Sequence, residues 1–152
     1  MQLSELSLRP FRNLEKQNLS FSSHRSLIYG ENGKGKSNIL EAISFLSIGK
    51  SIRGARDSQA IPHAGSFFDI RGVFIRNGSK KNIRVFYEKI GGKKVFIEEE
   101  QLSKVSDLVG EFRTVHFSPE DVSLVLRFPT KRRRLLDILI SQARPAYLKE
   151  LQ

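Results

Sequence analysis

One glycine-rich segment of this sequence combines the residue types and the spacing that bind phosphate groups. Gly30, Gly35, Lys36 and Ser37 fit the pattern G-x-x-x-x-G-K-[ST] without exception. Glycines let the backbone turn tightly, so that successive N–H groups point at phosphate oxygens. In this pattern the Lys36 ammonium reaches the β- and γ-phosphates, and the Ser37 hydroxyl is a ligand for Mg²⁺. The spacing therefore predicts a site for a nucleotide, namely ATP with Mg²⁺.

The segments on both sides of these residues are those that a phosphate-binding loop requires. Residues 26–29 are apolar enough to form a short strand that leads into Gly30. After the loop, apolar residues recur at helical spacing as far as Leu46, and Gly49 is suited to end the helix in a left-handed conformation. The N-terminus of that helix would add partial positive charge near the phosphates. The alternative, a flexible glycine turn before a helix, is disfavoured by this strand–loop–helix context.

Hydrophobic periodicity predicts an antiparallel β layer around this core. Apolar residues alternate loosely over 3–8, and a second short strand is expected around 19–21. Between residues 66 and 97 the period is two, which predicts three further strands. Asn77-Gly78 and Gly91-Gly92 supply the residues that reverse antiparallel strands.

Residues after 100 predict mainly helices. A short helix is expected over 103–109 and a strand over 113–117, with further helices beginning near Ser118, Thr130 and Pro145. The fold class is therefore α/β. We expect a P-loop ATP-binding lobe with an antiparallel β layer over residues 1–118, and the start of a helical lobe over residues 119–152.

The sequence excludes one class of P-loop protein and does not support hydrolysis. The Asn-Lys-x-Asp motif with which GTPases bind guanine is absent. An ATPase of this superfamily also needs an apolar strand that ends in an acidic residue. The nearest candidate, Leu135-Leu136-Asp137, follows Arg134 and has a helical pattern. We therefore expect the chain to bind ATP and to be inactive as an ATPase on its own, and we assign no catalytic residue.

The charge balance favours a polyanionic partner. The chain carries 26 basic and 16 acidic residues, a net charge of +10. Nucleic acid is the preferred partner over an anionic membrane, and a solvated basic surface is the alternative. The densest basic run is the predicted DNA contact, or else a solvated helix face; it comprises Lys131, Arg132, Arg133 and Arg134. The apolar residues beside it, over 135–140, are expected in the core.

The absence of cysteine and of a long apolar run bears on where in the cell the protein is expected. The chain has no cysteine, which excludes disulfides and fits a reducing cytoplasm. No apolar run approaches the roughly 18 residues of a membrane span. We therefore expect a cytoplasmic protein with no membrane partner.

Further motifs resemble one known family, the bacterial recombination-repair ATPase RecF, which is related to the ABC-type heads of SMC proteins. The opening Leu6-x-Leu8-x3-Phe11-Arg12-Asn13 is similar to that family's N-terminal strand and turn, and residues 30–43 are similar to its Walker A loop and helix. Later motifs follow in the same order: Gly49-Lys50-Ser51-x-Arg53, Phe117-Ser118-Pro119-Glu120-Asp121, Pro129-x2-Arg132-Arg133, Leu136-Asp137 and Pro145-x-Tyr147-Leu148.

The resemblance implies a P-loop NTPase core of the ABC/SMC-head type that binds gapped or single-stranded DNA in repair, replication, recombination and the SOS response. It implies an ATP-dependent homodimer that works with RecO and RecR to load RecA. The family's chain is longer, with its signature and Walker B motifs further along, so we expect this chain to be an N-terminal portion. The alternatives are an SMC-like P-loop ATPase outside repair, and a DNA-binding module with a vestigial P-loop.

The motif and the resemblance together define the predicted nucleotide site. Arg12 is included because its turn resembles one that approaches the nucleotide in ABC-type heads, and because a guanidinium suits phosphate geometry. Glu31 is expected to contribute only its backbone, since phosphates would repel its carboxylate. Ser37 is also the predicted Mg²⁺ ligand. The full set is Arg12, Gly30, Glu31, Asn32, Gly33, Lys34, Gly35, Lys36, Ser37 and Asn38.

Overall fold

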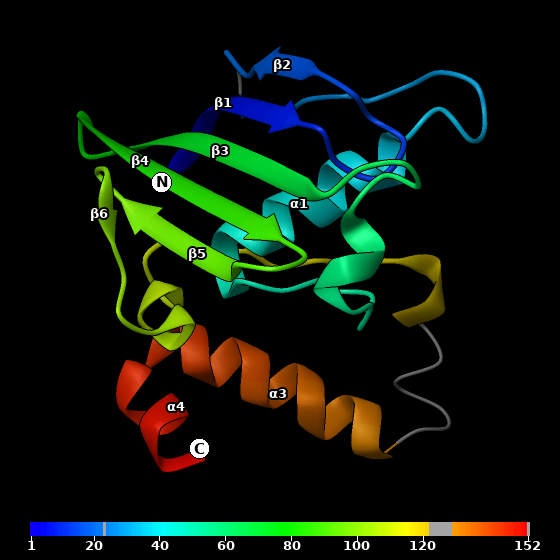
Figure 1. The fold of residues 1–152 in the computed structure, drawn as a ribbon. Helices are drawn as coiled ribbons and strands as arrows, with labels where there is room; N and C mark the ends of the chain where they lie inside the picture. Colours follow the sequence, from blue (N-terminus) through cyan, green and yellow to red (C-terminus); the bar gives the residue numbers. More distant parts are fainter. Residues whose placement is uncertain (23, 122–128, 152) are drawn as a thin grey trace.

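The computed structural model describes residues 1–22, 24–121 and 129–151 (Figure 1). Its centre is one antiparallel sheet with the strand order β2-β1-β3-β4-β5-β6. The strands are β1 (Gln2–Arg9), β2 (Gln17–Ser20), β3 (Phe67–Arg76), β4 (Ser79–Glu88), β5 (Gly92–Ile97) and β6 (Glu100–Gln101). The predicted strands over 3–8, 19–21 and 66–97 are therefore confirmed.

Turn chemistry explains how the long strands reverse. Asn77 and Gly78 connect β3 to β4, and both have positive φ angles, of 52° and 81°. Gly92, at φ 72°, begins β5 directly after the next reversal. Positive φ is the conformation that tight hairpin turns require, and glycine and asparagine adopt it at the lowest cost.

The core lies between one face of this sheet and the helix α1 (Lys36–Ile48). Phe11, Phe45 and Phe68 meet there edge to face, with ring centroids 5.2 to 5.7 Å apart. Gly72 of β3 has no side chain, which lets Leu46 of α1 approach the strand closely. The helix that carries the phosphate loop is therefore fixed directly on the central strands. As predicted, it ends at Gly49, which is left-handed at φ 70°.

The C-terminal helices lie at the end of the sheet formed by β5 and β6, below β5 in Figure 1. They are α3 (Pro129–Ala143) and α4 (Pro145–Leu151), as predicted from Thr130 and Pro145. Short 3₁₀ helices occupy Asp57–Ala60 (η1), Val105–Leu108 (η2) and Pro119–Asp121 (η3). The helix expected from Ser118 is seen as η3 up to Asp121, and residues 122–128 lie outside the described part of the chain. The predicted boundary near residue 118 remains a prediction.

A buried polar cluster joins α3 to α1. Ser47 of α1 donates to the Phe112 carbonyl at 2.7 Å and lies 3.1 Å from the Gln142 side-chain oxygen. The Gln142 amide pairs with the backbone of Thr114 in both directions, at 2.7 and 3.0 Å. Because all these groups are satisfied, α3 is docked on the far end of the P-loop helix through hydrogen bonds.

Two predicted strands and one predicted core segment are wrong. Residues 26–29 and 113–117 form neither helix nor strand, and neither segment belongs to the six-stranded sheet. Leu27 and Val115 are consequently 83% and 80% exposed. A strand needs a neighbour to hydrogen-bond with, and Thr114 instead pairs with a side chain. The segment 135–140 is also not fully buried, since Leu136 is 55% exposed and α3 buries chiefly Ser141 and Gln142.

Among the described residues, none of the helices has the length and apolar character needed to cross a bilayer.

Candidate nucleotide-binding site

The predicted phosphate loop is a glycine-dependent turn at the start of α1. Gly30, Gly33 and Gly35 have φ angles of 145°, 81° and 94°, values that L side chains rarely adopt. Gly35 is the residue that precedes the helix, and no described side chain caps it. The first N–H groups of a helix have no partner within the helix, and the helix dipole places partial positive charge there. This end of α1 is therefore suited to bind an anion.

Lys36 lies across the loop rather than extending into solvent. Its ammonium donates to the carbonyl oxygens of Gly30 and Glu31, at 2.8 and 2.7 Å. A positive charge is thus held over the glycine backbone, where the motif places the β- and γ-phosphates. The Glu31 carboxylate is exposed and lies 3.7 Å from the exposed Lys34 ammonium. The acidic side chain therefore points outward, as expected.

The turn over residues 11–14 forms the floor beneath the loop. Asn13 donates from its side-chain amide to the Gly33 carbonyl at 2.7 Å and accepts from Asn38 at 2.8 Å. Leu14 lies directly under Gly35, where an added Cβ would come within 2.6 Å of its side chain. Glycine is therefore required at position 35 both by the left-handed backbone and by this close approach.

Behind the loop, Glu41 of α1 is a buried carboxylate that joins three segments. Its side chain is 0% exposed and accepts two hydrogen bonds from the Arg12 guanidinium, at 2.5 and 3.1 Å. Ser51 donates to it at 2.5 Å, and Arg53 lies 3.4 Å away. Burial alone would raise the pKa of Glu41, but these hydrogen bonds and the charges of both arginines outweigh it and hold the pKa below its usual value.

Arg12, which the sequence analysis assigned to the nucleotide site, is engaged by protein groups in this arrangement. The third guanidinium nitrogen donates to the Gln59 carbonyl at 2.8 Å, so all its nitrogens have protein partners. A direct phosphate contact by Arg12 stays a prediction. Sequence reasoning missed Glu41, although an acidic residue between Leu40 and Ala42, one turn after Ser37, was a usable signal.

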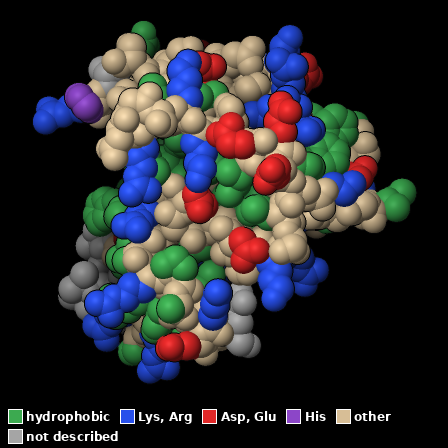
Figure 2. All heavy atoms as spheres, turned by 90° about the vertical axis from the view of Figure 1, so that its left-hand side faces the viewer, with side chains coloured by type: hydrophobic (Ala, Val, Ile, Leu, Met, Phe, Trp, Pro, Cys, Tyr) green, Lys and Arg blue, Asp and Glu red, His purple; other side chains and the backbone are tan. Residues whose placement is uncertain are grey.

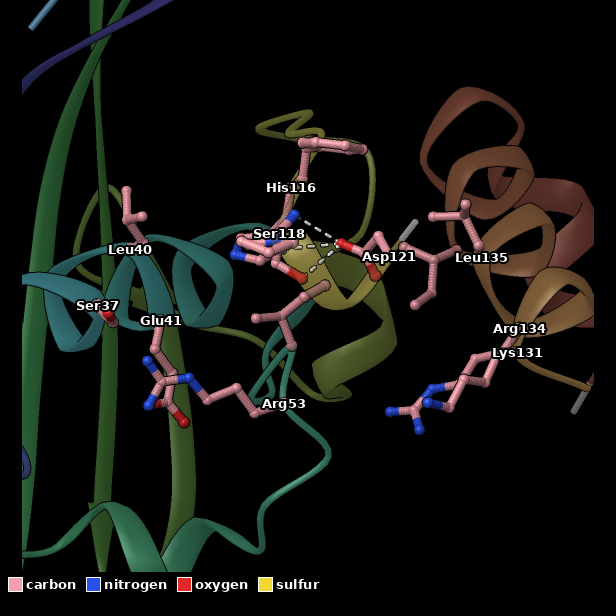
Figure 3. Close-up of a pocket in the computed structure, with 14 residues that line it drawn as sticks. Ser37, Leu40, Glu41, Arg53, His116, Ser118, Asp121, Lys131, Arg134 and Leu135 are labelled. Atoms are coloured by element: carbon pink, nitrogen blue, oxygen red, sulfur yellow. Dashed lines mark hydrogen bonds and ion pairs between the residues drawn. The ribbon is translucent and has the colours of Figure 1, made fainter. Parts of the chain in front are cut away.

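A cavity of about 660 Å³ opens beside Ser37 (Figure 3). Ser37 and Glu41 border it from α1, and Arg53 borders it from the loop that follows. Lys131 and Arg134 extend into it from α3. Ser118 and Asp121 border the cavity on a third side. There the Asp121 carboxylate accepts hydrogen bonds from the backbone N–H and the hydroxyl of Ser118, at 2.7 and 2.9 Å.

Residues from two separately predicted sites line this one cavity. Lys131 and Arg134 belong to the predicted DNA-contacting run, and Ser37 is the predicted Mg²⁺ ligand. The other two members of the run, Arg132 and Arg133, do not line this cavity. Figure 2 shows a further face of the molecule, on which acidic side chains lie among the basic ones. The excess positive charge is thus not one uninterrupted patch on that face.

Comparison with known proteins supports the motif-based resemblance. A family model described as an AAA domain matches residues 5–121. The protein called DNA replication and repair protein RecF from Caldanaerobacter subterraneus subsp. tengcongensis is 39% identical over 99% of this chain, and that from Chloroherpeton thalassium is 40% identical over 99%. This chain spans 42% and 41% of their respective lengths. The predicted resemblance to RecF is therefore confirmed.

Solved structures agree with the fold class. A structure of the recombination mediator protein RecF-ATPrS in the RecFOR pathway has a TM-score of 0.93 and 38% identity, covering 99% of this chain and 41% of that one. The corresponding RecF-ATP structure has a TM-score of 0.91. An SMC ATPase with 21% identity has a TM-score of 0.71, covering 91% of this chain and 99% of that one, which shows a shared fold. The α/β P-loop head predicted from the sequence is confirmed.

Proposed function

We propose that this chain, which belongs to the AAA domain family, is an ATP-binding portion of a RecF-type repair protein and binds Mg²⁺-ATP through residues 30–38. One observation carries the proposal. The Lys36 ammonium lies over a left-handed glycine loop at an uncapped helix N-terminus. Those groups form a donor set that complements a polyphosphate.

The donor set fits both groups that the proposal requires. In this proposal, amides of residues 33–37 and the Lys36 ammonium bind the phosphates, and the Ser37 hydroxyl, which faces the cavity, is a ligand for Mg²⁺. Bound Mg²⁺ neutralises phosphate charge. Relatives solved as RecF-ATP and RecF-ATPrS support ATP as the nucleotide.

The rest of the proposal concerns partners. We infer that the full protein binds gapped or single-stranded DNA, with Lys131, Arg132, Arg133 and Arg134 as phosphate contacts, because the net charge is +10 and the run lies on α3 near the nucleotide loop. By similarity to RecF, it would act in the cytoplasm as an ATP-dependent homodimer with RecO and RecR, load RecA, and serve recombination and the SOS response. Arg12 would join the nucleotide site only by leaving its present partners.

Titration calorimetry with Mg²⁺-ATP tests the central proposal. Replacing Lys36 with Ala should weaken ATP binding by about 1.5–3 kcal/mol, roughly 10- to 150-fold, because a charge-assisted contact is lost. Lys80→Ala is the matched control, since this lysine is exposed on β4 and lies outside the phosphate loop. Equal ATP affinity in the wild type and the Lys36 variant would overturn the assignment.

A further inference from the structure

The turn between β1 and β2, which lies beneath the phosphate loop, is held in place by its own backbone hydrogen bonds. Phe11 and Leu14 form a backbone bridge closed by hydrogen bonds of 2.7 and 2.8 Å. Arg12 at its tip is left-handed, with φ 55°, a strained conformation for a side chain of this size. Its backbone N–H is held by the Ala60 carbonyl at 2.8 Å. The turn is therefore fixed independently of the loop above it.

Asn13 is the residue by which this rigid turn contacts the loop. Its side-chain amide donates to the Gly33 carbonyl, and its side-chain oxygen accepts from Asn38, in the first turn of α1. One carboxamide thus bridges the middle of the loop and the helix that follows. The side chain belongs to a largely exposed residue, so burial does not account for its orientation.

The direction of the Gly33 carbonyl decides what the next amide can do. A peptide unit is planar and its C=O and N–H point in opposite directions. Holding the Gly33 carbonyl toward Asn13 turns the N–H of Lys34 away from the floor and toward the side on which a ligand would bind. Glycine at φ 81° could otherwise rotate through other conformations at low cost.

We propose that Asn13 is a positioning residue for nucleotide binding: it holds the Gly33–Lys34 peptide in the phosphate-binding orientation without contacting the nucleotide. This inference rests on the proposed function of the loop. It assigns to the turn a role that differs from a phosphate contact by Arg12, because Arg12 is occupied by Glu41 and Gln59. Preorganised donors bind an anion more tightly because they need not be ordered on binding.

Two substitutions separate this role from a purely structural one. Asn13→Ala removes both side-chain hydrogen bonds. Asn13→Asp has the same shape and keeps the acceptor for Asn38, but it cannot donate to Gly33 when ionised. Asn18→Ala is the matched control, because Asn18 is exposed on β2 and its side-chain oxygen accepts a hydrogen bond from the Ser7 hydroxyl, away from the phosphate loop. Binding of Mg²⁺-ATP and Mg²⁺-ADP is measured by calorimetry well below each variant's Tm.

We expect Asn13→Ala to weaken ATP and ADP binding about three- to tenfold, and Asn13→Asp to weaken it more, since it adds a negative charge beside the phosphates. Asn18→Ala should bind as the wild type does. Wild-type-like ATP affinity in both Asn13 variants would overturn the inference, as would a lowered Tm with unchanged affinity. Failure of the wild type itself to bind ATP would instead refute the proposed function of the loop.

Discussion

Replacing Glu41 with Gln should reveal how much the buried carboxylate behind the loop contributes to stability. The substitution preserves the shape of the side chain but leaves Arg12 and Arg53 facing a neutral amide. Removing one partner of a buried ion pair costs about 3–5 kcal/mol when the other charge stays buried. Here the Arg12 side chain is 21% exposed, so water compensates part of the loss.

Arg53 adds little to this magnitude. Its side chain is 44% exposed and its contact with Glu41 is 3.4 Å, and exposed pairs contribute at most about 1 kcal/mol. We therefore expect Glu41→Gln to lower the free energy of unfolding by about 2–3 kcal/mol at pH 7. For a chain of this size that corresponds to a Tm lower by roughly 4–12 °C. Arg53→Gln should cost less than about 1 kcal/mol.

The pH dependence provides an independent check. The pKa of Glu41 is lowered in the folded state from its ordinary value of 4.5. The carboxylate therefore stabilises the fold fully above that value, and the contribution is lost as pH falls below 4.5 through the folded-state pKa. Urea unfolding at pH 7 and pH 3.5 measures it as the difference between wild type and variant, with exposed Glu15→Gln as control. A loss below about 0.5 kcal/mol at pH 7, or a difference that does not shrink at low pH, would refute the reasoning.

Three further expectations follow from other parts of the molecule. Gly35→Ala should destabilise the fold by about 2 kcal/mol or more in thermal unfolding and weaken ATP binding, because its Cβ would lie 2.6 Å from the Leu14 side chain. Gly78→Ala is the control and should cost less, because Gly78 has a similar φ but open space around it. Replacing arginines 132–134 with Gln should flatten the log-linear fall of DNA affinity with salt concentration. An unchanged slope would mean that these arginines form a solvated helix face and do not contact DNA phosphates. Gln142→Leu should cost about 1–3 kcal/mol in urea unfolding, because Thr114 and Ser47 lose buried partners; a smaller loss would mean that water replaces the amide.

Local patterns in the sequence were sufficient for the loop, α1 and the antiparallel strands. Each depends on residues close together in the chain: glycines at fixed spacing, helical periodicity before Gly49, and turn residues such as Asn77 and Gly78. The errors at 26–29 and 113–117 have one physical cause. An apolar extended run becomes a strand only when a neighbour pairs with its backbone, and pairing is a property of the whole sheet.

The geometry behind the loop could not be predicted because it joins distant segments. Glu41 meets Arg12 from one segment and Ser51 and Arg53 from another, and no spacing rule links them. The same holds for Lys131, whose place beside Ser37 depends on how α3 docks. The resemblance to RecF supplied the family correctly, but it did not indicate that Arg12 is engaged by Glu41.

The position of β1 in the sheet has a consequence for how the chain folds. β1 lies between β2 and β3, and its pairing with β3 joins Leu8 to Ile70, roughly sixty residues apart. The phosphate loop, α1 and the Arg12 turn all lie within the segment that this pairing closes. Such a non-local pairing must overcome a large loop-closure entropy, so it is slow compared with helix and hairpin formation. Refolding rate and recovery of ATP binding should therefore share one rate-limiting step, the docking of the N-terminal strand.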